Sequence, residues 1–243
     1  MTDTELTKAV QAALEKDPCV DLHQFPITVR EQQGRVVLEG RVRDIVAKRL
    51  APRLAAEAIG QPGAGRVLDH LQVTAGEERG DGEILDSLYD SLTREGAFRG
   101  YAVALRQGER TGPGKSLEDG VTGVVEISVD QGVVRLEGNV ESLSHKRLAE
   151  VLAWWVRGCV DVDNRLHVVP PERDTDDEIT DALRIVLEKD PWLDASQIGI
   201  HVRNRIVDLE GLLPSAEQKR MAEYDAWYIP GVHEVINRIE VRP

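Results

Sequence analysis

The stretch VEISVDQGVVRLEG (residues 125–138) has the pattern of a β-hairpin that ends in Leu-Glu-Gly. Apolar and polar residues alternate on both sides of a short turn, which is typical of two antiparallel strands with one buried face. The same pattern occurs in ITVREQQGRVVLEG (27–40) and in IGIHVRNRIVDLEG (198–211). We therefore predict three hairpins in one chain. The spacing of the apolar residues gives the first a turn two residues longer than that of the second.

Each hairpin is preceded and followed by a helical pattern, and a short strand comes last. Before the hairpin, apolar residues recur in steps of four and so share one helical face. These runs are LTKAVQAALEKDP (6–18), ILDSLYDSLTREG (84–96) and ITDALRIVLEKDP (179–191). After it, the helix ends at glycine, a common C-terminal signal, in AKRLAPRLAAEAIG (47–60), HKRLAEVLAWWVRG (145–158) and QKRMAEYDAWYIPG (218–231). The final strands are VLDHLQV (67–73), VDVDNRLHV (160–168) and VHEVINRIEV (232–241).

Four residues bear on where these helices begin. Asp3, Asp81 and Asp176 stand just before the first helix of each unit, and we predict them as N-caps. Pro52 falls in the second helix of the first unit, where it is tolerated if it lies in the first turn.

The sequence therefore predicts an α+β chain of three tandem αββαβ units. Each unit has a small three-stranded mixed sheet packed by two helices on one face. The polar linkers TAGEERG and PPERDTDD divide the chain into units at 1–76, 77–171 and 172–243, of which the first is the most divergent.

The middle unit carries a long insertion near 98–122. Tyr101, Val103 and Leu105 alternate within it, so part of it is able to add a strand. The remainder is either an ornamental loop or a functional lid or partner loop.

Composition and charge exclude several classes of protein. With 30 basic and 43 acidic residues the net charge is −13, which opposes binding to nucleic acid phosphates. No apolar run approaches the length of a transmembrane helix, which is about 18 residues. The N-terminus lacks the pattern of a secretory signal, and Cys19 and Cys159 form no metal or disulfide spacing, so we expect a cytoplasmic protein.

Sequence patterns of catalysis are missing. None of the six histidines has a partner at the spacing of a helical metal pair, and there is no GxSxG, Walker or dinucleotide-binding motif. We expect no enzyme activity, no catalytic residue, no metal and no cofactor.

The repeated unit resembles the BON domain (bacterial OsmY and nodulation). The resemblance rests on VDQGVVRLEG followed by KRLAEVLAWWVRGCVDVDNRLHV, and on RNRIVDLEG followed by KRMAEYDAWYIPGVHEVINRIEV. It implies the αββαβ fold, a role in osmotic or envelope stress and binding to phospholipid membranes or other hydrophobic partners. It implies no catalytic residues.

Two groups of residues are candidates for an interface. The basic run of the first unit is either a solvated face or a contact for anionic headgroups or an acidic partner; it consists of Arg41, Arg43, Lys48, Arg49 and Arg53. Adjacent aromatic pairs stand at matching positions of the second helices in units two and three, Trp154 with Trp155 and Trp227 with Tyr228. Because adjacent helical residues point about 100° apart, we expect at least one ring of each pair at a contact between units, subunits or ligand.

These observations predict a non-enzymatic, stress-associated binding protein. It would engage phospholipid headgroups or a protein partner through its helix faces. The alternative is a structural assembly or oligomerisation module that resembles ring-building αββαβ domains, and a homo-oligomer is possible in either case.

Overall fold

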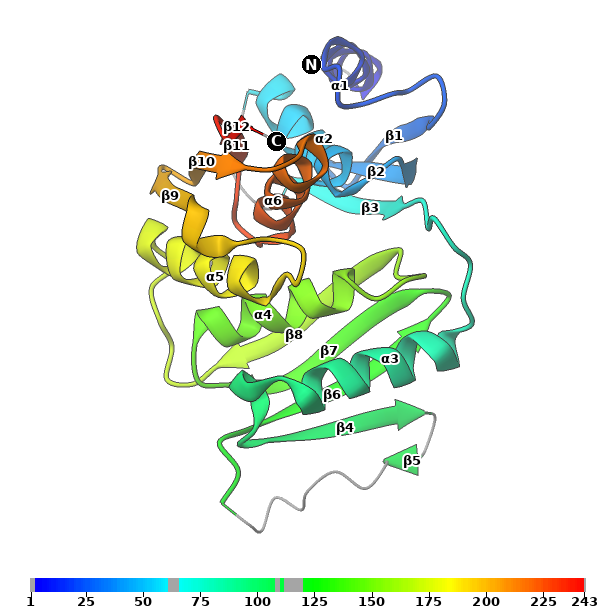
Figure 1. The fold of residues 1–243 in the computed structure, drawn as a ribbon. Helices are drawn as coiled ribbons and strands as arrows, with labels where there is room; N and C mark the ends of the chain where they lie inside the picture. The colour runs from blue at the N-terminus through cyan, green and yellow to red at the C-terminus, as the bar shows by residue number, and fades with distance from the viewer. Residues whose placement is uncertain (1–2, 61–65, 108–109, 112–119, 243) are drawn as a thin grey trace. The chain divides into compact units, whose positions relative to one another are not determined.

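The computed structural model describes residues 3–60, 66–107, 110–111 and 120–242 (Figure 1). The chain forms two compact bodies, an N-terminal body up to Thr74 and a C-terminal body from Ala75. The three sheets are separate, and each belongs to one αββαβ repeat, so the predicted fold class is confirmed. The domain boundaries at residues 76 and 171 remain a prediction.

The N-terminal body holds the first repeat. Its sheet has the order β1-β2-β3, with β1 antiparallel and β3 parallel to β2. Apolar side chains of both helices and all three strands form one buried cluster, which includes Leu14, Leu38 and Leu71. The elements are α1 (Asp3–Lys16), β1 (Ile27–Gln32), β2 (Arg35–Val42), α2 (Ile45–Ala58) and β3 (Val67–Val73).

The second repeat opens the C-terminal body and has a wider sheet, of order β5-β4-β6-β7-β8. The insertion supplies β4, which pairs in parallel with β6, so it does add a strand. Residues 108–109 and 112–119 of the insertion lie outside the described residues. The elements are α3 (Asp81–Arg94), β4 (Tyr101–Gln107), β5 (Arg110–Thr111), β6 (Gly123–Asp130), β7 (Val133–Val140), α4 (Leu143–Trp154) and β8 (Asp161–Val168).

The third repeat completes the same body. Its hairpin strands β9 and β10 are antiparallel, and β10 pairs in parallel with two short strands, β11 and β12. A 3-10 turn precedes β9. The elements are α5 (Asp176–Lys189), η3 (Ala195–Gln197), β9 (Ile198–Arg203), β10 (Ile206–Leu213), α6 (Ala216–Tyr228), β11 (Glu234–Asn237) and β12 (Glu240–Val241).

All three hairpins have two-residue turns, so the longer turn predicted for the first was wrong. In the first hairpin the strand continues through polar residues, and Gln32 pairs with Arg35. The turn residues of each hairpin have positive φ angles: 54° and 78° at residues 33 and 34, 52° and 77° at 131 and 132, and 52° and 63° at 204 and 205. Such turns match the twist of paired strands, which fixes the register.

Asp81 and Asp176 bind these turns instead of capping their helices. Each is the first residue of its helix, and Gly80 and Thr175 hold the N-cap positions. The Asp81 carboxylate accepts hydrogen bonds from the turn amides of residues 131 and 132, at 2.9 and 2.8 Å. Asp176 accepts from residues 204 and 205 at 2.7 and 2.9 Å. These two acids therefore join helix to hairpin, which corrects the capping role predicted for them, while the side chain of Asp3 lies outside the described part of the chain.

The structure explains the glycine of Leu-Glu-Gly. Gly40, Gly138 and Gly211 have φ angles of 138°, 121° and 140°, which side-chain-bearing residues rarely adopt. A Cβ at Gly138 would overlap the carbonyl oxygen of Val124 on the neighbouring strand. The tripeptide therefore marks the point where two backbones approach most closely.

We expect Gly138→Ala to lower the free energy of unfolding of the C-terminal body by about 3 kcal/mol, because it adds both backbone strain and overlap. Urea unfolding of the full chain measures the loss. Gly82→Ala is the matched control, since Gly82 lies in α3 with no atom within 4 Å of its added Cβ. An equal loss in both variants would contradict the explanation.

Candidate functional site

The helices of the second and third repeats pack against each other. Figure 1 shows α4 lying against α5, and α4 also contacts α6. Arg147 of α4 is 3% exposed and donates from Nε to the carbonyl of Pro230 at 3.1 Å. Its second amino group pairs with Asp174, which also pairs with Arg205 at 3.1 Å. A buried guanidinium thus connects α4 to both ends of the third repeat.

Cationic partners lower the pKa of two carboxyl groups at this contact. Burial alone would raise the pKa of Asp174, but Arg147 and Arg205 outweigh burial and hold that pKa below its usual value. Glu95, just after α3, accepts a hydrogen bond from Lys189 of α5 at 2.7 Å. Burial opposes ionisation of Glu95, yet this ion pair and backbone amides lower its pKa. Both carboxylates are therefore held ionised between the two repeats.

Both aromatic pairs lie where these two repeats meet. Trp154 and Trp227 are buried, while Trp155 and Tyr228 are half-buried. The Trp154 ring stacks on Tyr228 of the other repeat, with centroids 6.3 Å apart. Trp155 donates from Nε1 to Asp225 of α6 at 3.3 Å. Trp154, Trp155 and Tyr228 therefore contact the other repeat, and the binding of an external partner by the aromatic pairs stays a prediction.

Asp225 is a buried acid that sequence reasoning missed. Its side chain is 3% exposed, and the Asp190 carboxyl group is its acidic neighbour. Burial, reinforced by Asp190, raises the pKa of Asp225 to about 8. The signal was present in the repeats, because the equivalent residues are Leu54 and Leu152. A polar residue at an otherwise apolar repeat position indicates a special contact.

The basic run of the first repeat does not form one exposed patch. Arg41 and Arg43 are exposed near the end of β2, and Arg43 pairs with Asp44. Arg49 and Arg53 are half-buried on α2. Lys48 is only 5% exposed, and its ammonium donates to the carbonyl of residue 71 at 2.6 Å. Lys48 is therefore part of the folded body, and the anion-binding role of the others stays a prediction.

The burial of Lys48 reflects substitutions in the first repeat. In the third repeat, Asn237 donates to the carbonyl of Lys219 and to the carboxylate of Glu223. The first repeat has Asp69 at the asparagine position, and Lys48 pairs with it at 3.2 Å. Pro52 replaces the glutamate and lies well inside α2, beyond the first turn, where the sequence pattern would tolerate it best.

A shallow groove of about 480 Å³ lies on the helices of the first repeat. Small apolar side chains of α1 and α2 form most of its walls, and the charged pair Lys16 and Asp17 stands at one end. Asp17 accepts a hydrogen bond from the amide of Cys19 at 2.9 Å. The remaining lining residues are Ala9, Ala12, Ala13, Pro18, Leu54 and Ala58.

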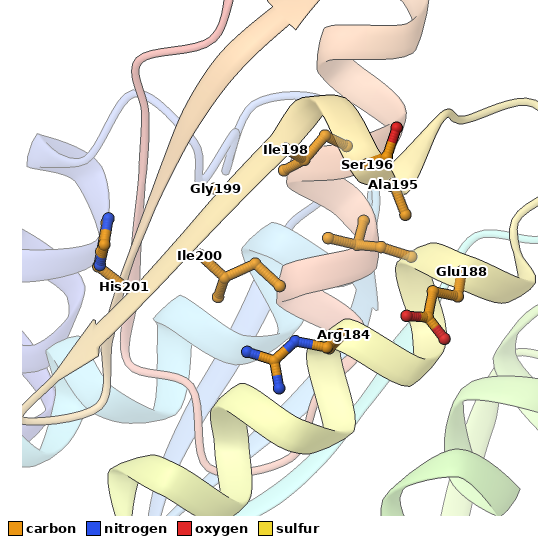
Figure 2. A pocket seen from close by; sticks show the side chains of 9 residues that line it. Arg184, Glu188, Ala195, Ser196, Ile198, Gly199, Ile200 and His201 are labelled. Atoms are coloured by element: carbon orange, nitrogen blue, oxygen red, sulfur yellow. The ribbon is translucent and has the colours of Figure 1, made fainter.

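A second cavity, also of about 480 Å³, lies in the third repeat between α5 and the edge strand β9 (Figure 2). Figure 2 shows Arg184 of α5 extending toward Ile200 of β9. Ile200 is half-buried, and its neighbours on the strand, Gly199 and His201, are exposed. The remaining lining residues are Leu187, Glu188, Ala195, Ser196 and Ile198.

Trp192 is a second residue that sequence reasoning missed. Its side chain is 69% exposed, between α5 and η3. Its amide donates to Asp190 at 2.8 Å and its carbonyl accepts from Gln218 at 2.7 Å, so the backbone that presents the ring is held on both sides. The first repeat has Cys19 at the same position. The signal in the sequence was an aromatic residue at a position that differs between the repeats.

Within the described ranges, no group of three or more histidine, cysteine or acidic side chains is arranged to hold a metal ion. None of the described helices is both long enough and apolar enough to cross a bilayer.

Two solved structures of CdsD, a structural protein of the type III secretion system of Chlamydia trachomatis, resemble this chain at 14% identity. One comparison covers 100% of both chains, and the other covers 98% of this chain and 93% of CdsD. The TM-score is 0.25 in each case, too low for a shared arrangement or function to be inferred.

Comparisons with a curated relative and with a family model assign the sequence to a protein family. Osmotically-inducible protein Y of Escherichia coli (strain K12) is 27% identical over 124 residues, which are 49% of this chain and 62% of the relative. The chain thus matches less than two thirds of the relative's length. A model of the BON domain matches residues 2–75, 120–170 and 175–243, one segment in each repeat. Since these segments make up most of the sequence, the chain belongs to the BON domain family.

Proposed function

We propose that this chain is a non-catalytic, stress-associated binding protein that binds a protein partner through the helix face of its first repeat. One observation carries the proposal: the helix faces of the second and third repeats already bind each other within the chain. The similarity to an osmotically inducible protein supports the proposed association with stress. A cytoplasmic location stays a prediction, which fractionation of host cells would test.

The partner that fits this face best is a second copy of the chain. Between the second and third repeats, Lys189 at the end of α5 pairs with Glu95 after α3. The equivalent residues of the first repeat are Lys16 and Asp17. The first repeat alone therefore carries a lysine and an acid at the two positions that form this ion pair. Lys16 is exposed, and Asp17 holds the amide two residues on, as Glu95 does. Two copies therefore supply complementary charge beside an apolar groove.

Sedimentation of the full chain tests this proposal. We expect reversible self-association that Lys16→Glu weakens about tenfold, because the new carboxylate faces Asp17 of the other copy. Lys8→Glu is the control, since Lys8 is exposed on α1 but does not line the groove. A monomer at every accessible concentration, or equal weakening by both variants, would exclude the second copy as partner.

A second candidate is an anionic phospholipid headgroup, favoured by the exposure of Arg41 and Arg43. Flotation with vesicles of phosphatidylglycerol, compared with phosphatidylcholine alone, tests it. Binding that requires the anionic lipid and is lost in Arg41→Glu/Arg43→Glu would support the lipid. Flotation that is equal for both lipids, or absent, would reject it.

A further inference from the structure

We propose that the outer edge of β9 binds an extended apolar segment of another polypeptide, which adds to the third sheet as a parallel strand. This inference concerns the third repeat and does not depend on the proposed function of the first. It rests on a comparison of two equivalent sheet edges within this chain.

The second repeat shows what covers this edge. There β4 lies in parallel along β6, with Val103 opposite Val125 and Leu105 opposite Ile127. The strand also contacts α3, so it closes the space between sheet edge and helix. As a result Val125 and Ile127 are both 0% exposed. Tyr101 is likewise buried.

The third repeat has the same edge without this strand. Ile200 pairs with Leu209 of β10 as Ile127 pairs with Leu136, so the two isoleucines are equivalent. Among the described strands, β9 is paired only with β10. Ile200 is half-buried where Ile127 is fully buried. The cavity of Figure 2 lies between β9 and α5, in the space that corresponds to the position of β4.

The first repeat shows that this opening is not inherent in an edge strand. Its residue at the same position, Val29 of β1, is 7% exposed although no described strand covers β1. The third repeat therefore combines a strand whose outer edge has no described partner with a cavity beside it, lined by apolar side chains and by Arg184 and Glu188. Unpaired backbone amides and carbonyls give affinity for an added strand, and the cavity selects its side chains.

The chemistry of the ligand follows from β4. That strand reads Tyr-Ala-Val-Ala-Leu from residue 101, with larger apolar residues alternating with alanine. A segment of this kind places its larger side chains beside Ile198 and Ile200, and its small residues allow close approach to the exposed Gly199.

A labelled peptide of sequence YAVALRQ, which copies residues 101–107, is the probe. We expect saturable binding to the full chain by fluorescence anisotropy, and none for a scrambled peptide. Ile200→Glu should weaken binding about tenfold or more, because it removes the apolar side chain on which the added strand would pack. Arg203→Glu is the control, since Arg203 is exposed on the same strand but does not line the cavity.

Hydrogen exchange of the wild-type chain with the peptide locates the binding and does not depend on a variant that folds. Protection of residues 198–203 alone supports the proposal. Protection or release at residues 123–130 would mean that the peptide exchanges with β4, which would overturn it. Absence of binding, or equal binding by both variants, would also overturn it. Self-association through Lys16 is measured separately, so failure of one proposal does not affect the other.

Discussion

Arg147→Ala is expected to lower the free energy of unfolding of the C-terminal body by about 3 kcal/mol. The guanidinium is 3% exposed and binds both the carbonyl of Pro230 and the carboxylate of Asp174. Its removal leaves that half-buried carbonyl without its donor and weakens the hold on Asp174, and such losses are costly in a partly buried contact. The second and third repeats should then unfold in separate steps in urea.

Two variants give the matched comparison. Arg157→Ala removes an arginine that is 74% exposed and pairs with Glu77 at 3.3 Å, and it should cost less than about 1 kcal/mol. Arg147→Lys keeps the charge but loses the planar fork, so its effect should be intermediate. Equal stability of Arg147→Ala and Arg157→Ala would show that the buried arginine does not join the repeats.

Asp225→Asn is expected to stabilise the C-terminal body increasingly as the pH rises from 5.5 to 7.5. The pKa of Asp225 is raised to about 8 by burial and by Asp190, whereas an unfolded aspartate ionises near pH 4. Between these values the folded state holds a proton that the unfolded state releases. Wild-type stability therefore falls by about 1.4 kcal/mol per pH unit from this group, and the loss ends above the folded pKa.

The asparagine variant reproduces the protonated acid without the titration. Its amide is able to donate to Asp190 and to accept from Trp155, so at pH 5 the variant and wild type should be nearly equal in stability. Chemical unfolding at several pH values measures the difference, which should grow by about 3 kcal/mol between pH 5.5 and 7.5. A difference that is the same at every pH would contradict a protonated Asp225.

Much of the fold could be predicted because the same sequence pattern recurs at equivalent positions of the three repeats. Leu-Glu-Gly, the apolar steps of the first helices and the glycine after the second helices gave three αββαβ repeats. The turn of the first hairpin was misjudged because polar residues such as Arg30 and Gln32 continue the strand beyond its buried face. The alternation of apolar and polar residues shows which positions are buried, whereas backbone pairing of the strands continues into exposed residues.

The contacts between repeats were harder to predict. The aromatic pairs were visible, but which repeat they contact depends on tertiary packing that no local pattern records. Lys48 was grouped with exposed arginines, although its burial follows from Asp69 replacing an asparagine. Asp225 and Trp192 were detectable only by comparing equivalent positions of the three repeats.

The helix faces of the second and third repeats bind each other within the chain, and we propose that the helix face of the first repeat binds a second chain. Hydrogen exchange of the full chain at low and high protein concentration tests it most directly. We expect that protection at residues 9–18 and 54–58 rises with concentration, while protection in α4 and α5 is high throughout. Protection that is unchanged on α1 and α2 while the chain associates through another surface would contradict it.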